Sequence, residues 1–355
     1  MLGVVNLSNW MDTGHKVSVV TEKYTALVGE KEALILHWIV FTVLCQAIDI
    51  FGTVTNIINI ICFVKQGFKE SINVSLLGLA VSDIGCLTTL IWTNICYTPA
   101  FTTADLPFDV GELQSLASGW PHVAFSRITC WITAFITLER CLCITIPLKV
   151  KGMMTTNRVS AIIVCIFVIL ISSMAPAYIV NRPGIKFFPH RNKTLLGIVY
   201  GANRESVEKI FYAINSVFIP FCAFAVIIVC TGTLVVQLQR KTKWRIKSAQ
   251  CAQSDNISNR NEKVAKMVVM ISSMFISCFT PLGLIFIAMS LEPELSHDGK
   301  YQHVLRMAGG ICVVFESVNS SANIFIYYHM SSKFKETFRA LFARNDASTR
   351  QTNIR

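Results

Sequence analysis

The chain has 355 residues, of which 53% are hydrophobic and only 15% are charged, and its formal net charge is +11. So apolar a composition argues against a soluble globular fold and indicates a helical protein that crosses a membrane several times. The positive charge does not indicate a nucleic-acid partner, because the basic residues lie in short segments between apolar runs and form no long basic and aromatic track.

Seven apolar segments follow a polar N-terminal stretch, residues 1–33, in which we find no apolar core of a signal peptide. Each segment is long enough to cross about 30 Å of hydrocarbon as a helix. We find no soluble domain and no internal repeat between them, so we expect an all-α, seven-transmembrane helix bundle over residues 34–330. The predicted helices are 34–64, 72–93, 116–146, 159–180, 207–238, 264–291 and 304–330.

The basic residues predict how the bundle is oriented. Nearly twice as many Lys and Arg residues lie in the segments after the odd-numbered helices as in the opposite set. Cytoplasmic loops carry this excess, so we expect a multi-pass plasma-membrane protein with an extracellular N-terminus. Two glycosylation sequons, at Asn6 and Asn192, would then lie outside.

The residues after the last apolar segment predict a helix on the inner membrane surface. Residues 331–342 place Phe334, Phe338 and Phe342 on one face and basic side chains on another. Such a pattern is typical of a short amphipathic helix that contacts membrane lipids. Residues 343–355 are predicted to be a disordered tail.

Several polar side chains fall inside the apolar segments, where they need partners. An ionised Asp83 surrounded by the neutral oxygens of Thr129, Asn319 and Asn323 would suit Na⁺, a hard cation. The alternative is a polar network that only fixes helix packing. The residues alone leave both interpretations open.

A charged pair, Glu139–Arg140, lies at the cytoplasmic end of the third apolar segment. Adjacent opposite charges neutralise each other, and Arg140 could later exchange Glu139 for another partner, as in a switch at a membrane face. The alternative is an interfacial anchor with an extended Arg side chain. In the sixth segment, Phe275 and Phe279 share a helix face, and Pro281 removes a backbone hydrogen bond and is expected to bend the helix.

These motifs and their order resemble the rhodopsin-like G-protein-coupled receptors over nearly the whole chain. The resemblance implies a heterotrimeric G protein as partner and an activation switch. Finer details look most like invertebrate chemosensory receptors and peptide receptors of the FMRFamide type. The residues that match the family's switch motifs are Glu139, Arg140, Pro147, Phe275, Phe279, Pro281, Asn323 and Tyr327.

The chain also departs from the family. Ser115 stands where the family has a cysteine, and the second outer loop has none, so we expect the usual disulfide to be absent. Most of the thirteen cysteines lie in apolar segments and are interpreted as small hydrophobic residues. Phe279 replaces a Trp and Ile324 replaces a Pro, which leaves the details of activation open.

The resemblance places the ligand site in the outer half of the bundle. The expected ligand-binding residues are His122, Ser126, Arg127, Phe279 and Glu316. Arg127 and Glu316 either form a structural ion pair or contact the ligand. Together with charges of both signs in the outer loops, they favour a small peptide or an amino-acid-like ligand.

Other functional classes fit less well. The seven histidines are scattered, and no His-Glu-x-x-His motif occurs, so we do not expect an enzyme. No cofactor is expected apart from the candidate Na⁺ ion. The main alternative is a transporter or ligand-gated channel, although such proteins often show repeats and broken helices.

Overall fold

The computed structural model describes residues 39–146, 150, 152–247, 256–292, 294–295 and 300–352. The N-terminal segment, including Asn6, lies outside the described residues, and so does Pro147.

Seven helices in the described ranges are long and apolar enough to cross a membrane, which confirms the predicted seven-helix bundle. The observed spans overlap all seven predicted segments. Their bounds are Val43–Gln66, Ser71–Cys96, Val110–Thr145, Thr156–Val180, Arg204–Lys243, Asn261–Met289 and Val304–Met330.

Several spans combine an α-helix with a π-helical turn or a second helix. The three π-helical turns, η2, η3 and η5, each run directly into the α-helix that follows. A one-turn helix, α4 (Pro99–Thr102), lies between the second and third spans. In chain order the spans contain η2 (Ile39–Cys45) and α2 (Gln46–Gln66); α3 (Ser71–Cys96); α5 (Val110–Gln114), η3 (Ser115–Gly119) and α6 (Trp120–Thr145); α8 (Thr156–Ser172) and α9 (Ala175–Val180); α10 (Arg204–Tyr212), η5 (Ala213–Phe218) and α11 (Ile219–Lys247); α12 (Asn256–Leu291); and α13 (Gln302–Ser321) and α14 (Asn323–Met330).

Helix α6 is the centre of the bundle and packs against α3, α8, α11 and α12. Its buried side chains include both apolar residues and the polar residues considered below. The outer surface of the bundle is apolar: on α8, Val164, Val168 and Ile169 are each more than half exposed. Contiguous apolar surface of this kind is unsuited to water and fits contact with lipid.

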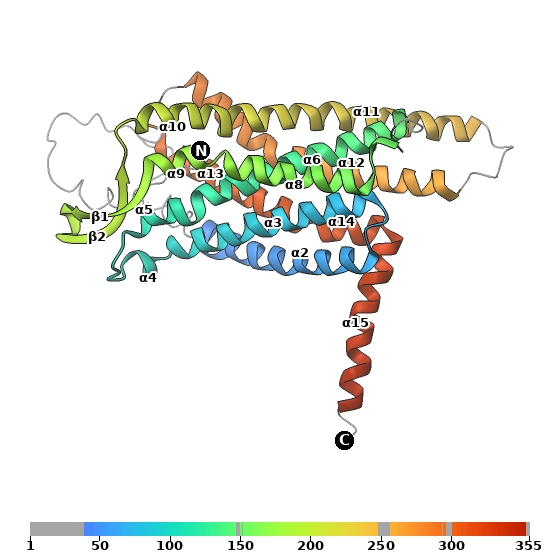
Figure 1. Ribbon diagram of the computed structural model, residues 1–355, viewed down its shortest axis with the longest axis horizontal. Helices are drawn as coiled ribbons and strands as arrows, with labels where there is room; N and C mark the ends of the chain where they lie inside the picture. The colour runs from blue at the N-terminus through green and yellow to red at the C-terminus, as the bar shows by residue number, and fades with distance from the viewer. Residues whose placement is uncertain are drawn as a thin grey trace.

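A β-hairpin that the sequence analysis did not predict covers one end of the bundle (Figure 1). Strands β1 (Asn181–Phe188) and β2 (Lys193–Tyr200) are antiparallel and joined by the short 3₁₀ turn η4 (Pro189–Arg191). Asn192 ends this turn in the left-handed region, with φ 49°, and its side chain is exposed. We call this end of the molecule the hairpin end.

A buried carboxylate holds the hairpin to the helices. Glu112 on α5 accepts hydrogen bonds from Lys186 Nζ at 2.7 Å and from the backbone N–H of Ile198 at 2.6 Å, so it contacts both strands. The approach is close, because a Cβ atom on Gly197 would lie 2.5 Å from Glu112 Oε2. The twelve cysteines that the structure describes are free thiols. Glu112 lies three residues before Ser115, the position where the family has its cysteine, so the polar contact holds the hairpin close to the place of the usual disulfide.

Helix α15 (Ser332–Thr352) leaves the opposite end of the bundle and runs across the direction of the other helices (Figure 1). Phe334 is buried against Phe63 and Tyr327, so the start of α15 is anchored by aromatic packing. The helix is longer than the predicted amphipathic helix at 331–342 and extends to Thr352, into the segment 343–355 that was predicted to be a disordered tail. No Gly or Pro is present there to stop it. We call this end the α15 end.

Candidate functional site

The charged pair at the α15 end is present and shares an additional partner. Arg140 Nη2 donates to Glu139 Oε1 at 2.6 Å, and the hydroxyl of Ser71, at the start of α3, donates to the same oxygen at 2.5 Å. Glu139 is fully buried and Arg140 is 9% exposed. The pair is therefore enclosed by the bundle, and α3 helps to hold it. Glu262 on α12 forms an ion pair with Lys266 at 2.8 Å.

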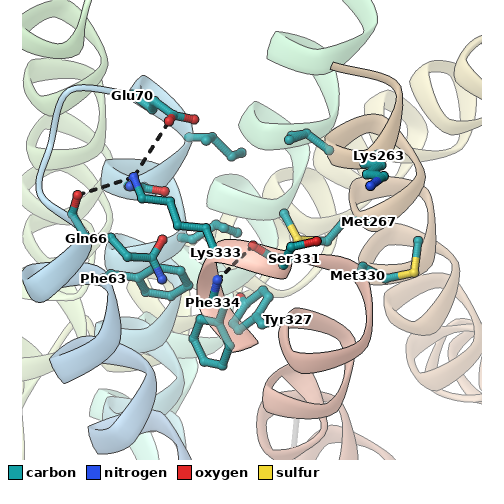
Figure 2. Close-up of a pocket in the computed structure, with 15 residues that line it drawn as sticks. Phe63, Gln66, Glu70, Lys263, Met267, Tyr327, Met330, Ser331, Lys333 and Phe334 are labelled. Carbon is teal, nitrogen blue, oxygen red and sulfur yellow. Dashed lines mark hydrogen bonds and ion pairs between the residues drawn. The ribbon is translucent and has the colours of Figure 1, made fainter. Parts of the chain in front are cut away.

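A cavity of about 420 Å³ lies at the α15 end, between α2, α3, α12, α14 and α15 (Figure 2). Lys333 reaches across its rim to Glu70, with 3.8 Å between Nζ and Oε1. Tyr327 lines the cavity, and its buried hydroxyl has no hydrogen-bond partner among the described residues. A protein that bound in this cavity would contact α2 and α3 on one side and α12, α14 and α15 on the other.

Asp83 forms the polar core near the middle of the bundle. Thr129 Oγ1 lies 3.2 Å from Asp83 Oδ1, and Asn323 Nδ2 donates to Asp83 Oδ2 at 2.8 Å. Asn323 begins α14 directly after the break between α13 and α14, so this contact joins the seventh span to α3. Three of the four predicted residues therefore meet. Asn319 is also buried, but no hydrogen bond joins it to Asp83 in the described structure.

An aromatic cavity of about 220 Å³ lies between α6, α11 and α12. Phe275 and Phe279 stack on its wall with 4.3 Å between ring centroids, which fits the predicted shared helix face. Pro281 lies inside α12, and the helix continues past it to Leu291. Arg127 from α6 is the charged residue of the lining.

Arg127 is held by a carbonyl group that a proline leaves available. Its Nε donates to the backbone oxygen of Asn215 at 2.8 Å. In the π-helical turn η5, the N–H of Ile219 bonds to the oxygen of Ile214, five residues earlier. The next donor in this pattern would be Pro220, which has no N–H, so the oxygen of Asn215 needs another partner. This contact places the Arg127 side chain against η5, the turn that leads into α11.

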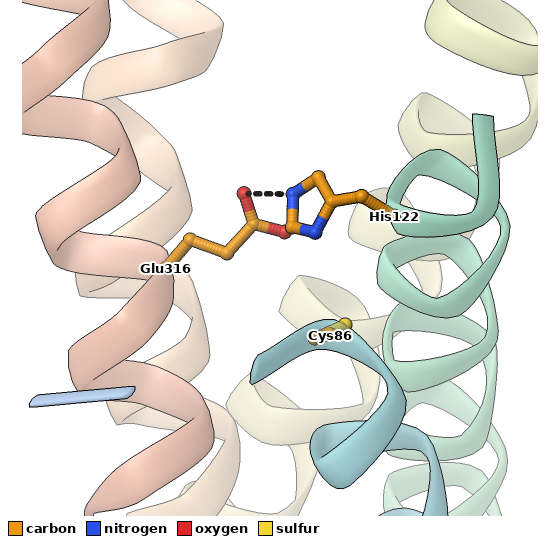
Figure 3. Close-up of side chains that lie close together, drawn as sticks. All are labelled: Cys86, His122 and Glu316. Carbon is orange, nitrogen blue, oxygen red and sulfur yellow. Dashed lines mark ion pairs between the residues drawn. The ribbon is translucent and has the colours of Figure 1, made fainter. Parts of the chain in front are cut away.

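Glu316 pairs with His122 and not with Arg127. Glu316 Oε2 lies 3.5 Å from His122 Nε2, and the two side chains point toward each other across the bundle (Figure 3). The possible Arg127–Glu316 ion pair is therefore not formed in this structure. Ser126 is buried one turn after His122 on α6. The sequence predicts that Arg127 and Glu316 lie at the same depth in the bundle. Depth does not define the direction of a side chain, and Arg127 turns toward η5.

The outer charges largely pair with each other. Besides the Glu112–Lys186 contact, Lys193 Nζ lies 2.7 Å from Asp105 Oδ1, and this ammonium lowers the pKa of Asp105. Both pairs join the segment before α6 to the hairpin. These charges were expected from the sequence to favour a ligand, whereas in the structure the two pairs fix the hairpin to the helices.

The model of the family described as serpentine type seven-transmembrane G-protein-coupled chemoreceptor Srw matches residues 43–345. The chain belongs to this Srw receptor family. The predicted resemblance to chemosensory receptors of the rhodopsin-like type is thereby confirmed.

Similar proteins of known name are also receptors. The chain is 23% identical to the type-1 angiotensin II receptor B of Xenopus laevis, over 83% of this chain and 76% of that protein. It is 22% identical to the allatostatin-A receptor of Bombyx mori, over 82% and 76%. It is 21% identical to the galanin-like G-protein coupled receptor npr-9 of Caenorhabditis elegans, over 84% and 72%.

The Srw chain is thus a multi-pass G-protein-coupled receptor that binds an extracellular ligand and acts through G proteins. The transporter or channel alternative is not favoured, and the matched relatives are receptors and not enzymes.

Some residues of the receptor's polar interior were missed from the sequence. Asp49 on α2 is fully buried, and one of its oxygens accepts from Asn94 at 2.9 Å. Ser71 and Asn215 were missed because their contacts come from other helices. Cys86 was interpreted as a small hydrophobic residue, yet its sulfur faces His122 and Glu316 (Figure 3). Asp49 could have been found from the sequence, because it is an acidic residue within an apolar segment.

Proposed function

We propose that the Srw receptor lies in the plasma membrane, with the hairpin end and the N-terminus outside, and binds a small zwitterionic ligand. Suitable ligands are an amino-acid-like chemosensory cue or a small peptide. The observation that carries this proposal is the position of Arg127, a guanidinium on the wall of an otherwise largely apolar, aromatic cavity.

The cavity offers two kinds of interaction to such a ligand. Arg127 would bind a carboxylate, because a guanidinium donates two parallel hydrogen bonds to this group. Phe275 and Phe279 would pack on an apolar or aromatic side chain. Glu316 on α13 lies outside this lining and contacts His122 on α6, and it would bind an amine of a ligand that extends beyond the cavity.

The opposite end of the bundle suits a G protein. In the proposed switch, Arg140 leaves Glu139 and contacts the G protein when α12 moves outward from α14. The cavity at the α15 end lies between these helices and is lined by Met267 and Tyr327. The buried, unpaired hydroxyl of Tyr327 would gain a partner in the rearranged state.

Asp83, Thr129 and Asn323 support the proposed ion-sensitive core. Asp83 and Thr129 bring their oxygens together within the bundle, and Asn323 donates Nδ2 to Asp83 while its own Oδ1 is buried without a partner among the described residues. Na⁺ would bind to the oxygens of Asp83 and Thr129, and a turn of the Asn323 amide would add a third; Asn319 is on α13. An ion there would bind the resting arrangement in preference to the active one, and so would oppose the agonist.

Two further features fit this orientation. Asn192, exposed at the hairpin turn, would be accessible to glycosylation outside the cell, and Asn6 belongs to the same N-terminal side. Helix α15 would lie on inner-leaflet lipids through Phe338 and Phe342, with Lys335 nearer the headgroups.

The test is a ligand screen with amino acids and small peptides on receptor expressed at the cell surface, read out as calcium and cyclic AMP. An active ligand is then tested on Arg127→Gln and Glu316→Gln. Both changes should lower its potency by more than tenfold, which is about 1.4 kcal/mol. The matched control is Arg204→Gln, because Arg204 is a partly exposed cation at the hairpin end that pairs with Glu208.

A loss of potency in the control equal to that in Arg127→Gln would contradict the assignment, as would normal potency in both cavity variants.

A further inference from the structure

Three side chains with metal-binding atoms meet inside the hairpin half of the bundle. Cys86, His122 and Glu316 come from α3, α6 and α13, and one donor atom of each lies within 4.8 Å of the other two. In Figure 3 the carboxylate and the imidazole face each other and the sulfur lies beneath them. Cys86 is 2% exposed and His122 is 8% exposed, so the cluster is enclosed by protein.

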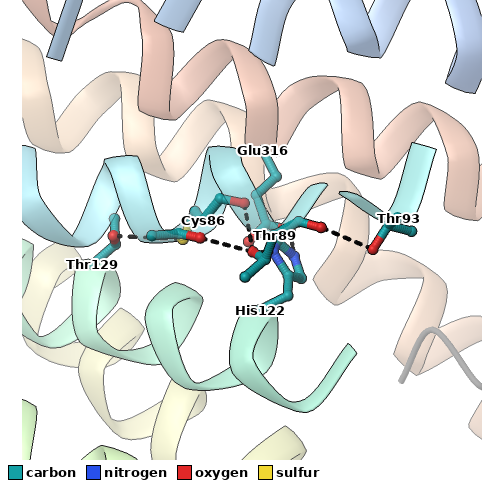
Figure 4. A network of polar contacts seen from close by, with 7 residues as sticks. Cys86, Thr89, Thr93, His122, Thr129 and Glu316 are labelled. Atoms are coloured by element: carbon teal, nitrogen blue, oxygen red, sulfur yellow. Dashed lines mark hydrogen bonds and ion pairs between the residues drawn. The ribbon is translucent and has the colours of Figure 1, made fainter. Parts of the chain in front are cut away.

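The hydrogen bonds around His122 prepare one ring nitrogen to accept a cation. Thr89 Oγ1 lies 2.8 Å from the oxygen of Gly85 and 2.7 Å from that of Cys86, and one of these carbonyls takes its only proton (Figure 4). Thr89 Oγ1 must then accept from His122 Nδ1, 3.3 Å away. In the neutral ring Nε2 therefore carries the lone pair, and this atom faces the carboxylate of Glu316.

A lone pair facing a carboxylate is repulsive unless a positive charge lies with them. Either a proton on Nε2 or a metal ion supplies it. Glu316 Oε1 is buried as well and has no hydrogen-bond partner among the described residues. The cluster thus presents an unused acceptor, an oriented imidazole nitrogen and a thiol at one point.

We propose that Cys86, His122 and Glu316 form a Zn²⁺ site inside the hairpin half of the bundle. Zn²⁺ is bound by sulfur, imidazole nitrogen and carboxylate oxygen at about 2.0–2.3 Å. In a tetrahedral site such ligands are roughly 3.5 Å apart, which follows from those bond lengths. The three donor atoms lie within 4.8 Å of one another, and small rotations of the side chains would bring them to this spacing.

Charge and coordination are consistent with this ion. Binding releases the Cys86 thiol proton to solvent, so thiolate and carboxylate together balance the two charges of Zn²⁺. The hydroxyl of Thr89 holds His122 in position as an outer partner of the metal site. Three protein ligands leave a fourth position open to water or to an amine or carboxylate of a ligand.

The role of the open fourth position in ligand binding rests on the proposed function, with the metal ion in place of a direct contact between Glu316 and an amine, but metal binding itself requires neither an agonist nor a G protein. The experiment is a Co²⁺ titration of the purified full-length receptor in lipid nanodiscs, without a polyhistidine tag. We expect a thiolate-to-Co²⁺ charge-transfer band that saturates at one ion per receptor and is abolished by added Zn²⁺. Cys86→Ser should remove the band, and Glu316→Gln should weaken Co²⁺ binding at least tenfold.

Cys62→Ser is the matched control, because Cys62 is also fully buried but lies on α2 outside the cluster. It should keep the band. If Cys86→Ser does not fold, mass spectrometry of the unmutated receptor gives a second measurement: Zn²⁺ should protect Cys86 from a thiol reagent and leave the labelling of Cys62 unchanged. A missing band in the unmutated receptor, a band that survives Cys86→Ser, or equal labelling of Cys86 with and without Zn²⁺ would overturn the proposal in favour of a proton on His122. Failure of the ligand screen alone would leave these measurements unaffected.

Discussion

Ser71 donates a hydrogen bond of 2.5 Å to Glu139, at the same carboxylate oxygen that accepts from Arg140. Helix α3 therefore takes part in holding the charged pair of α6. A hydrogen bond to a charged group contributes about 1.5–3 kcal/mol, enough to shift a resting equilibrium by about tenfold or more. We expect Ser71→Ala to raise signalling without agonist several-fold, measured as G-protein activation at equal surface expression.

Ser75→Ala is the control for this prediction, because Ser75 is buried one turn further along α3 and its hydroxyl bonds to the carbonyl of Ser71 within the same helix. It should leave basal signalling unchanged. Equal basal signalling in the Ser71 variant and the unmutated receptor would show that this bond does not hold the resting state.

Arg140 is the cation that the proposed switch transfers to the G protein. Arg140→Ala should abolish agonist-driven signalling and leave surface expression near normal, because the pair lies at the α15 end and the ligand cavity toward the hairpin end. The measurement is nucleotide exchange on the G protein with a saturating agonist. Full signalling by this variant would contradict its assigned role.

Asp83 is expected to make agonist binding sensitive to Na⁺. Replacing K⁺ by Na⁺ at constant ionic strength should lower agonist affinity in the unmutated receptor, because ion and agonist favour different states. Asp83→Asn should remove the difference between the two salts. Agonist affinity that is the same in Na⁺ and K⁺ before mutation would leave only a packing role for this core.

Glu112 should stabilise the hairpin in place of a disulfide. Glu112→Ala leaves the N–H of Ile198 without its buried partner, at a cost of about 1–3 kcal/mol. Hydrogen exchange of β1 and β2 should become about tenfold faster. Asp105→Ala should have little effect, because its pair with Lys193 is exposed and solvent screens such pairs.

A reducing agent offers a second check on the hairpin. Because the twelve described cysteines are free, it should leave hairpin exchange unchanged. Two results would contradict the role of Glu112 in holding the hairpin. One is faster hydrogen exchange of the hairpin after reduction, and the other is an exchange rate in Glu112→Ala equal to that of the unmutated receptor.

The helices and the polar core were predictable from the sequence because both follow from position along the chain. The length of an apolar segment is enough to predict a membrane span. The contacts of Asp83 with Thr129 and Asn323, although not one with Asn319, follow from the similar depth of these residues in their helices. Contacts that depend on side-chain direction were not predictable. Depth suggested that Arg127 meets Glu316, but Pro220 leaves the carbonyl of Asn215 in η5 without a backbone donor, and Arg127 bonds to it instead.

The hairpin was missed for a different reason. Its strands contain Pro183 and two glycines and show little alternation of apolar and polar residues, so the pattern is weak. The tether by Glu112 arises only when the strands are in place.

The most direct test of the proposed ligand site is the affinity of an identified amino-acid-like or peptide agonist for the purified receptor and for Arg127→Gln. Arg127 is 6% exposed and lines the aromatic cavity, so loss of its charge should remove the carboxylate contact. The expected result is at least a tenfold loss of affinity in a receptor that still folds, although the ligand-free variant should be less thermally stable because it loses the hydrogen bond to the oxygen of Asn215. Unchanged affinity would contradict the account and move ligand recognition away from this cavity.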